Sequence, residues 1–300
     1  MAERVSPSPL RVYLTLVLGI FACATSVIFI RKSTTDAILL SAARLLLAAL
    51  FLLPVFWRDI KKHAGFTLKE LLLRAAWPAV LLGIHFISWI MGARLTLAAN
   101  ASIIVNMVPA VSPLLLLLLT REIVNRREAA GTIIALIGVV LLAFEDYHLS
   151  RDFFRGDIIC FLSMLFYASY LVMARRNRAM PSIWLYVVPL YAMAGFLCLV
   201  IYAAGLRMPS KTVFTNTPIV EWGIILGLTL VPTIIGHSIM NWSFKHLRGQ
   251  TVSICNQGQF IFAGALGLGL LGDVPGTLFY VASVLLVGGA ILSMARPAKG

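Results

Sequence analysis

Apolar stretches of about 20 residues alternate with short polar segments along the whole chain, and a helix needs about that many apolar residues to cross a bilayer. Each stretch therefore predicts one membrane-spanning helix. The sequence predicts ten such helices, at residues 12–30, 37–57, 75–92, 98–119, 129–144, 158–174, 183–204, 219–237, 249–271 and 277–294.

One part of this pattern occurs twice. The segment at residues 100–138 recurs at residues 251–289, displaced by 151 positions, so that Glu122 falls on Asp273. A displacement of half the chain indicates two related halves.

The two equivalent turns differ in charge. Glu122 lies in a turn rich in arginine, whereas the turn around Asp273 contains no cation. Because short basic turns stay on the cytoplasmic side, the two turns are predicted on opposite faces of the membrane. This is the pattern of an inverted repeat. It predicts an all-α integral membrane protein with ten transmembrane helices as two inverted five-helix repeats, at residues 1–148 and 149–300.

Composition agrees with a membrane protein. The 300 residues are 60% hydrophobic and 12% charged, with a mean hydropathy of +0.93, whereas soluble domains are about 45–50% apolar. The net charge of +13 comes from short clusters of Lys and Arg between apolar stretches. These clusters favour lipid headgroups as partners and argue against a nucleic-acid partner.

The distribution of cations predicts the orientation. If the amino terminus is cytoplasmic, 17 of the 25 Lys and Arg residues lie on the cytoplasmic side and seven on the other side. Both termini are therefore predicted in the cytoplasm, in a multi-pass plasma membrane protein such as one of the bacterial inner membrane. The first apolar stretch also resembles a signal peptide, but it continues to Ile30, which favours a retained helix.

No catalytic or metal-binding pattern is present in the sequence. The motifs His-Glu-x-x-His and Gly-x-Ser-x-Gly are both absent, so we do not expect an enzyme. The four cysteines all lie in predicted spans and lack metal-ligand spacing. We expect no cofactor and no metal, and we interpret these cysteines as small core residues: Cys23, Cys160, Cys198 and Cys255.

Several of these segments resemble a known family. Val108-Pro109-Ala110, Glu122, Gly131 and the run from Ala135 to Val139 are similar to the repeated unit of EamA-type transporters of the drug/metabolite transporter superfamily. The run from Ala42 to Ala49, which contains Arg44, is similar to that family too. The resemblance implies ten helices around a central cavity, bounded mainly by helices one, three, four, six, eight and nine. Phe260 departs from it, because Phe260 stands where the first repeat has Pro109.

Polar residues within spans are costly in hydrocarbon and are candidates for substrate binding. His85 and Trp89 are four residues apart on one helix face, and His237 and Trp242 form a comparable pair. Histidine binds carboxylates or relays protons, and tryptophan offers a flat apolar wall or a cation-binding face. The alternative is that the histidines bond neighbouring helices and the tryptophans mark the interface.

The fourth and ninth spans carry further candidates. Asn106, Pro109 and Pro113 share one face of the fourth span, where proline removes backbone hydrogen bonds, so this face is either a substrate-facing hinge or a structural kink. Asn256 and Gln257 in the ninth span are predicted to line the cavity. On the sixth span, Tyr167 is a further candidate for substrate contact.

Charged residues complete the prediction. Arg44 is interpreted as a structural residue bonded to helix-end carbonyls, with attraction of an anionic substrate as the alternative. Glu122 and Asp273 at helix ends are candidates for gating. We expect the polar segments at residues 58–74, 145–157 and 205–218 to be connections and no acidic residue to lie in the middle of a span. That absence disfavours proton-coupled export of cations.

The sequence therefore predicts a secondary transporter, an exporter by family resemblance, working by alternating access. Histidines, amides and aromatic residues favour a small neutral or zwitterionic solute such as an amino acid. The alternatives are a flippase for lipids or lipid-linked metabolites, and a multidrug exporter of the same fold. The glycines of the fifth and tenth spans suit close helix packing, and also a homodimer contact.

Overall fold

A computed structural model describes residues 8–63, 65–120, 125–174, 180–207, 216–247, 252 and 255–294. Within these ranges all regular structure is helical. The first half contains α1 (Pro9–Lys32), α2 (Ala37–Lys62), α3 (Leu68–Leu95), α4 (Ala98–Val105), α5 (Val108–Thr120) and α6 (Arg126–Leu149). The second half contains α7 (Arg151–Ala174), α8 (Trp184–Ala203), α9 (Pro218–Leu228), the π-helical η2 (Thr229–Gly236), α10 (His237–His246), α12 (Gln259–Leu271) and α13 (Thr277–Met294).

Seven helical runs in the described residues are long and apolar enough to cross a membrane. They are α1, α2, α3, α6, α7, α8 and the continuous run from Pro218 to Met240. Each corresponds to one predicted span. The apolar helices Ala98–Val111 and Thr277–Leu292 are shorter, and the predicted span at 249–271 lies partly outside the described residues.

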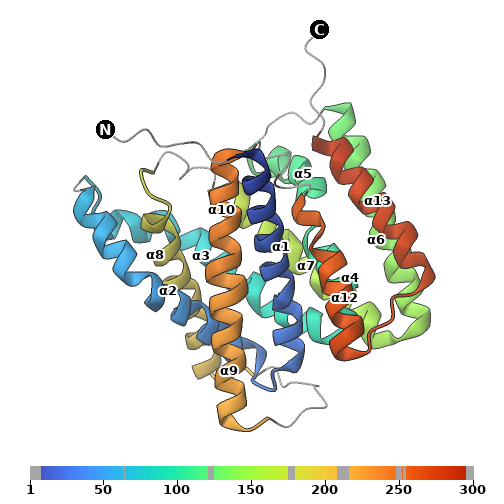
Figure 1. Ribbon diagram of the computed structural model, residues 1–300, viewed down its shortest axis with the longest axis horizontal. Coiled ribbons are helices and arrows are strands. Elements are labelled where there is room, and N and C mark those ends of the chain that lie inside the picture. Colours follow the sequence, from blue (N-terminus) through green and yellow to red (C-terminus); the bar gives the residue numbers. More distant parts are fainter. Residues whose placement is uncertain are drawn as a thin grey trace.

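The helices form a bundle in which segments distant in sequence lie side by side. In Figure 1, α1 stands beside the run of α9, η2 and α10, and α6 pairs with α13 at the edge of the bundle. α3 packs against both α7 and α8, and α2 packs against α8. The first turn of α1 and the last turn of α13 lie at the same end of the bundle (Figure 1).

The pair α6 and α13 shows why small residues recur in this sequence. A Cβ atom added at Gly289 would lie 2.5 Å from the Gly131 carbonyl oxygen, and one at Gly138 would lie 3.0 Å from the Ala282 carbonyl oxygen. The two backbones therefore approach closely because these positions are glycine, as in other membrane helix pairs.

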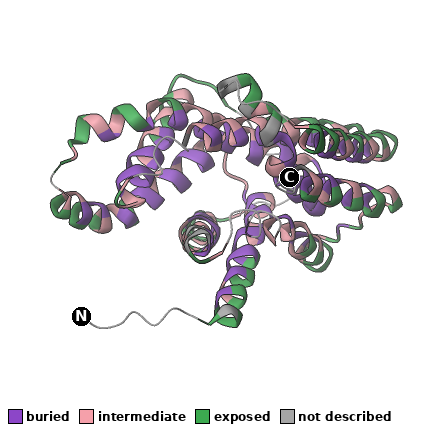
Figure 2. Ribbon diagram, turned by 90° about the horizontal axis from the view of Figure 1, so that it is seen from above, coloured by how far each residue is buried: buried purple, intermediate pink, exposed green. Residues whose placement is uncertain are grey.

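Burial follows the expected pattern for a protein surrounded by lipid. Figure 2 shows buried residues in the middle of the bundle and exposed residues on its outer faces. Large apolar side chains such as Trp77, Phe196 and Val284 are exposed on the outside. An outer surface this apolar is suited to hydrocarbon contact.

Two helices predicted as regular are irregular: one is broken, and the other continues with a change of winding. The helix predicted at 98–119 breaks at Asn106 and Met107, between α4 and α5. Asn106 bonds back to the Ser102 carbonyl oxygen through its side chain, at 2.8 Å, and Pro109 has no backbone N–H with which to continue the helix. In the run predicted at 219–237, η2 contains Pro232, and proline commonly interrupts the regular hydrogen-bond ladder in this way.

The prediction that residues 145–157 form a connection is wrong. α6 extends to Leu149 and α7 begins at Arg151, with Ser150 alone between them. The Ser150 hydroxyl accepts a hydrogen bond from the Asp152 N–H at 3.2 Å, as an N-cap residue does. The predicted connection at 58–74 is also mostly helical, because α2 ends at Lys62 and α3 begins at Leu68. Part of 205–218 lies outside the described residues.

Candidate functional site

Arg44 lies inside the bundle and is 2% exposed. Its Nε donates to Thr233 Oγ1 at 2.6 Å and its Nη1 to Ser26 Oγ at 3.4 Å. Its guanidinium carbon lies 4.5 Å from the centre of the Phe86 ring. Among the described residues it has no carboxylate partner. A buried cation with only neutral partners keeps most of its desolvation cost. An anionic group that bound beside the Arg44 guanidinium would offset that cost, so the site favours an anion.

The π-helical segment η2 explains the position of Thr233. Pro232 lacks an N–H, so it cannot bond to the carbonyl of Leu228 four residues earlier. Thr233 Oγ1 donates to that carbonyl oxygen at 2.9 Å. With its hydrogen used in this way, the hydroxyl accepts from Arg44. The proline of η2 thus fixes an acceptor for a cation on α2.

His85 is buried beside the same cation. Its Nδ1 lies 3.0 Å from the Ser163 carbonyl oxygen and 2.9 Å from Ser163 Oγ. Its ring stacks on Tyr167, with ring centres 4.7 Å apart. The structure therefore brings His85 and Tyr167 together, while Trp89 is buried in the main apolar core.

The charge of Arg44 acts electrostatically on both His85 and His237. One histidine from each half of the chain therefore lies within electrostatic range of the same buried arginine. We call these residues the Arg44 cluster: Ser26, Arg44, His85, Tyr167, Thr233 and His237.

A second polar cluster joins the α4–α5 break to the start of α12. Asn106 Oδ1 accepts from Asn256 Nδ2 at 2.9 Å and from Gln259 Nε2 at 3.4 Å. Gln259 Nε2 also lies 2.5 Å from Asn256 Oδ1. Gln257, which is the repeat equivalent of Asn106, is 2% exposed, and both of its side-chain polar atoms are buried without a hydrogen-bond partner. The sequence analysis selected Asn106, Asn256 and Gln257 as site residues. Gln259, a further polar residue of the ninth span, was not selected, although the structure joins it to the same cluster.

Trp242 does not join the Arg44 cluster through a ring contact. Its ring lies 4.2 Å, centre to centre, from that of His246 on α10, and His246 Nδ1 lies 2.9 Å from the Trp242 carbonyl oxygen. The ring contact shown for Trp242 is thus an i, i+4 pairing with His246, and the pairing of Trp242 with His237 stays a prediction.

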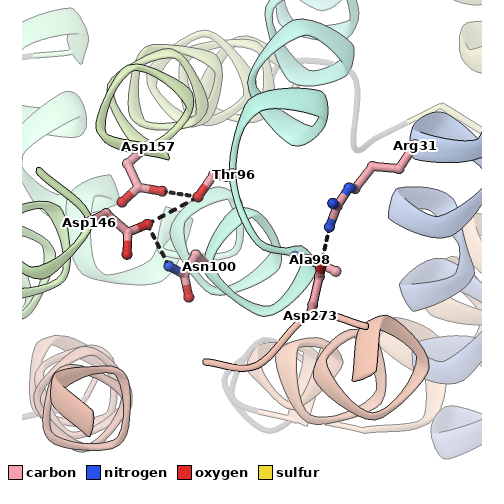
Figure 3. A network of polar contacts seen from close by, with 7 residues as sticks. All are labelled: Arg31, Thr96, Ala98, Asn100, Asp146, Asp157 and Asp273. Atoms are coloured by element: carbon pink, nitrogen blue, oxygen red, sulfur yellow. Dashed lines mark hydrogen bonds and ion pairs between the residues drawn. The ribbon is translucent and has the colours of Figure 1, made fainter. Parts of the chain in front are cut away.

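The structure gives clear positions to some of the predicted gating residues. Asp273 is 7% exposed, accepts from the Ala98 N–H at 2.8 Å and pairs with Arg31 (Figure 3). Ala98 begins α4, where no side chain of α4's own N-cap residue supplies an acceptor, so Asp273 caps this helix from the other half of the chain. Pro109 is the second residue of α5. Pro113 lies within α5, but its side chain is not among the described ones, and Glu122 lies outside the described residues.

The hydrogen-bond partners of Arg44 differ from those that the sequence analysis expected. The sequence analysis expected helix-end carbonyls, whereas its hydrogen bonds go to hydroxyls. The residue with the expected carbonyl partners is Arg94, which donates to the carbonyl oxygens of Ile30, Ser33 and Thr35 at 3.2, 3.1 and 2.8 Å. Arg94 thereby ties the end of α3 to the turn between α1 and α2.

Two acidic residues that sequence reasoning placed in a connection are buried in helices. Asp146 on α6 and Asp157 on α7 are each 1% exposed and both contact Thr96. Figure 3 shows the pair on one side of the break between α3 and α4, with Asp273 and Arg31 on the other. The helix-start pattern of Ser150 and Asp152 could have indicated that these acidic residues lie in helices, although it could not indicate their contacts. Within the described residues, no three His, Cys, Asp or Glu side chains are grouped as a metal site requires.

Comparisons with known proteins agree with this architecture. A protein of known crystal structure shares 18% sequence identity with the chain, with a TM-score of 0.60, over 96% of this chain and 98% of the other. At that identity the likeness shows a shared fold. No curated protein sequence matches the chain. The model of the EamA-like transporter family matches twice, at residues 10–144 and 154–295. Because these two matches cover nearly the whole sequence, the chain belongs to the EamA-like transporter family.

Proposed function

We propose that this protein is a secondary transporter that exports small neutral or zwitterionic metabolites, such as amino acids, by alternating access. Its two halves, residues 1–148 and 149–300, form inverted five-helix repeats with ten crossings in all. The protein lies in the plasma membrane, the inner membrane of a bacterium, with both termini in the cytoplasm. The substrate is held between the halves, near the middle of the bilayer.

The observation that carries this proposal is the set of partners around Arg44. A buried guanidinium bonded to two hydroxyls and an aromatic face has no negative charge to balance it among the described residues. A substrate carboxylate would supply that charge, and guanidinium and carboxylate groups match in a two-point hydrogen-bond geometry. Arg44 is therefore the residue that selects solutes with a carboxylate.

The rest of a zwitterionic solute requires neutral polar and aromatic groups. His85 and Tyr167 present stacked rings beside the cation. Beside the bonded amides of Asn106 and Asn256, Gln257 offers an amide oxygen without a partner, which can accept a hydrogen bond from an ammonium group. The two unpartnered atoms of Gln257 gain partners when a polar solute binds. The overall charge of such a solute is near zero, so it brings no net charge into the bundle.

Alternating access needs one end of the bundle closed while the other opens. The contact of Asp273 with Arg31 and with the Ala98 N–H ties α12, α1 and α4 together at one end. We call these three residues the latch. Opening this end requires the latch to break, and the α4–α5 break at Asn106 gives the chain a place to bend.

The experiment is exchange of radiolabelled solutes by the purified full-length protein in liposomes. We expect at least one of the standard L-amino acids to exchange, and its amide, which lacks the carboxylate, to exchange poorly. Arg44→Gln removes the guanidinium, and Arg155→Gln on the exposed face of α7 is the matched control. Transport of quaternary ammonium compounds without any amino acid would contradict the proposal.

A further inference from the structure

Asp146 and Asp157 form a buried pair, and within the described part of the chain neither carboxyl group has a salt-bridge partner. Thr96 Oγ1 lies 2.7 Å from Asp157 Oδ1 and 3.2 Å from Asp146 Oδ2. Asn100 Nδ2 donates to Asp146 Oδ2 at 2.7 Å. The four side chains come from α4, α6, α7 and the residue just after α3, and Figure 3 shows them converging.

The hydrogen bonds in this cluster require one more proton than two carboxylates carry. A threonine hydroxyl has a single hydrogen and can donate it to only one of the two aspartates. The other contact needs a hydrogen on a carboxyl oxygen. Asp146 Oδ2 already accepts from Asn100, so the extra proton belongs on Asp157 Oδ1. The chain then runs from the Asp157 O–H to Thr96 Oγ1, and from the Thr96 O–H to Asp146 Oδ2.

Among the residues that the structure describes, the surroundings of the pair do not supply a cation in place of that proton. On α3, Arg94 is directed to backbone carbonyls. On α6, Glu145 is a further carboxylate, which bonds to the Leu278 and Phe279 N–H groups of α13. On α7, Cys160 is buried near Asp157 and Arg155 pairs with Asp152 at the surface. α4, α13 and the described residues of α5 carry no charged side chain.

Two further atoms in the cluster lack donors. Asp157 Oδ2 and Asn100 Oδ1 are buried without a hydrogen-bond partner, although most buried polar atoms in proteins are bonded. Two ionised carboxylates in one buried site repel each other strongly, and such a site holds a proton instead. The cluster has more hydrogen-bond acceptors than donor hydrogens, and this imbalance indicates that the pair binds a proton.

The pair is mechanically connected to the latch. Thr96 contacts the acid pair, and Ala98, two residues later, contacts Asp273. A Cβ atom added at Gly156 would lie 2.7 Å from the Thr96 N atom, so glycine is needed there for α7 to reach the break. One short piece of backbone thus carries both contacts, so Thr96 and Ala98 place the acid pair and the latch two residues apart.

We propose that the Asp146–Asp157 pair binds the proton that drives transport by this protein. The inference rests on the proposed transport function and names its coupling ion. With the proton bound, Asp157, Thr96 and Asp146 form a continuous hydrogen-bond chain that holds the α3–α4 break and the latch in place. When the proton leaves, the two carboxylates repel, α7 moves away from the break, and Ala98 is released from Asp273.

The first test detects the proton without any substrate. Infrared spectra of the purified protein are expected to show the C=O band of a buried protonated carboxylic acid in acidic buffer and its loss in alkaline buffer. Asp157→Asn removes this band, and Asp152→Asn, on the exposed start of α7, keeps it. Thr96→Val, which removes the acceptor of the acid proton, shifts the frequency of the band.

The proposal is overturned if the wild-type protein shows no such band, if the band persists in alkaline buffer until the protein unfolds, or if it survives Asp157→Asn. Should that variant fail to fold, an unshifted band in Thr96→Val is equally decisive, because the acid would then not donate to Thr96.

The second test uses the L-amino acid that exchanges best in liposomes. An imposed pH gradient is expected to drive its accumulation in the wild type and in Asp152→Asn. In Asp157→Asn, accumulation relative to exchange is expected to be the same with and without the pH gradient. A lower amount of functional protein would reduce accumulation and exchange together and would leave their ratio unchanged. An unchanged ratio would contradict proton coupling. If the wild type exchanges no amino acid, the proposed substrate is wrong, and the infrared result still decides whether the pair binds a proton.

Discussion

Arg44 and Arg94 lie on neighbouring helices of the same bundle but have opposite kinds of partners. Arg94 donates to three backbone carbonyl oxygens, whereas Arg44 donates to two side-chain hydroxyls and faces an aromatic ring. Carbonyls at the end of a helix have few other partners, while hydroxyls rotate and accept other hydrogen bonds. The comparison supports a structural role for Arg94, which joins three backbone carbonyls, and supports the proposal that Arg44 binds the substrate.

The largest effect on stability is expected at Arg94. Arg94→Ala removes three hydrogen bonds and leaves their carbonyl oxygens without a donor, which costs about 3 kcal/mol at about 1 kcal/mol for each bond. The measurement is the free energy of unfolding of the purified protein in detergent. The control Arg155→Ala, at an exposed position, is expected to change stability by less than about 0.5 kcal/mol. A loss no larger than that of the control would show that the three carbonyls do not depend on Arg94.

Arg44→Gln is expected to show the reverse pattern. Exchange of the best amino-acid substrate falls about thirtyfold, which corresponds to about 2 kcal/mol of lost binding in the transport cycle. Stability changes by less than about 1 kcal/mol, because removing a buried charge with neutral partners also removes its desolvation cost. Exchange rates in liposomes and unfolding in detergent measure the two effects. A stability loss as large as that of Arg94→Ala, with exchange preserved, would reverse the assignment of the two arginines.

The latch provides a smaller, local effect. Asp273→Asn removes the charge that pairs with Arg31 and caps α4. The free energy of local opening at the first amides of α4 is therefore expected to fall by about 1 to 2 kcal/mol. Hydrogen–deuterium exchange at residues 98–101 then becomes about tenfold faster, since each 1.36 kcal/mol is a factor of ten. Asp152→Asn is the control. Unchanged exchange at the start of α4 would mean that Asp273 does not hold this end closed.

Thr233→Val gives the smallest expected effect. It removes one acceptor of Arg44 and should lower stability by about 1 kcal/mol, with a parallel loss of exchange because the guanidinium is less well oriented. Thr229→Val is a matched control on the same segment, since the Thr229 hydroxyl bonds only within its helix, to the Ile225 carbonyl oxygen at 2.8 Å. Equal loss of exchange in both variants would show that the Arg44 contact is not the cause.

The helical architecture was predictable because membrane helices have a simple cause. An apolar stretch long enough to span the bilayer must satisfy its backbone hydrogen bonds internally, so it forms a helix. The displaced repeat could be detected because both halves carry the same pattern of small, polar and apolar positions. Gly138 of α6 and Gly289 of α13 were correctly interpreted as contact positions, whereas a Cβ atom added at Gly288 would have no neighbour within 4 Å.

The interruptions and the partners were harder to predict. Proline at 109 and 232 indicates a lost hydrogen bond, but not whether the helix bends, breaks or becomes π-helical, because tertiary contacts decide this. Acidic residues 146 and 157 resembled a loop, since charge alone suggests solvent. Their burial depends on Thr96 and Asn100, about 50 residues earlier in the chain, and no local pattern encodes that contact.

The charge balance of Arg44 was not predictable either. Sequence places one arginine within a span, yet its partners come from α1, α3 and η2. Whether those partners are carbonyls, carboxylates or hydroxyls determines whether the arginine is structural or available to a substrate. That information exists only once the helices are packed.

The most direct measurement of the central claim is a comparison of two ligands on two proteins. Dissociation constants of the best exchanged L-amino acid and of its amide are measured for the wild type and for Arg44→Gln. If Arg44 binds the substrate carboxylate, the wild type prefers the acid by about tenfold or more, and this preference disappears in the variant. An equal preference for the acid in both proteins would contradict the claim.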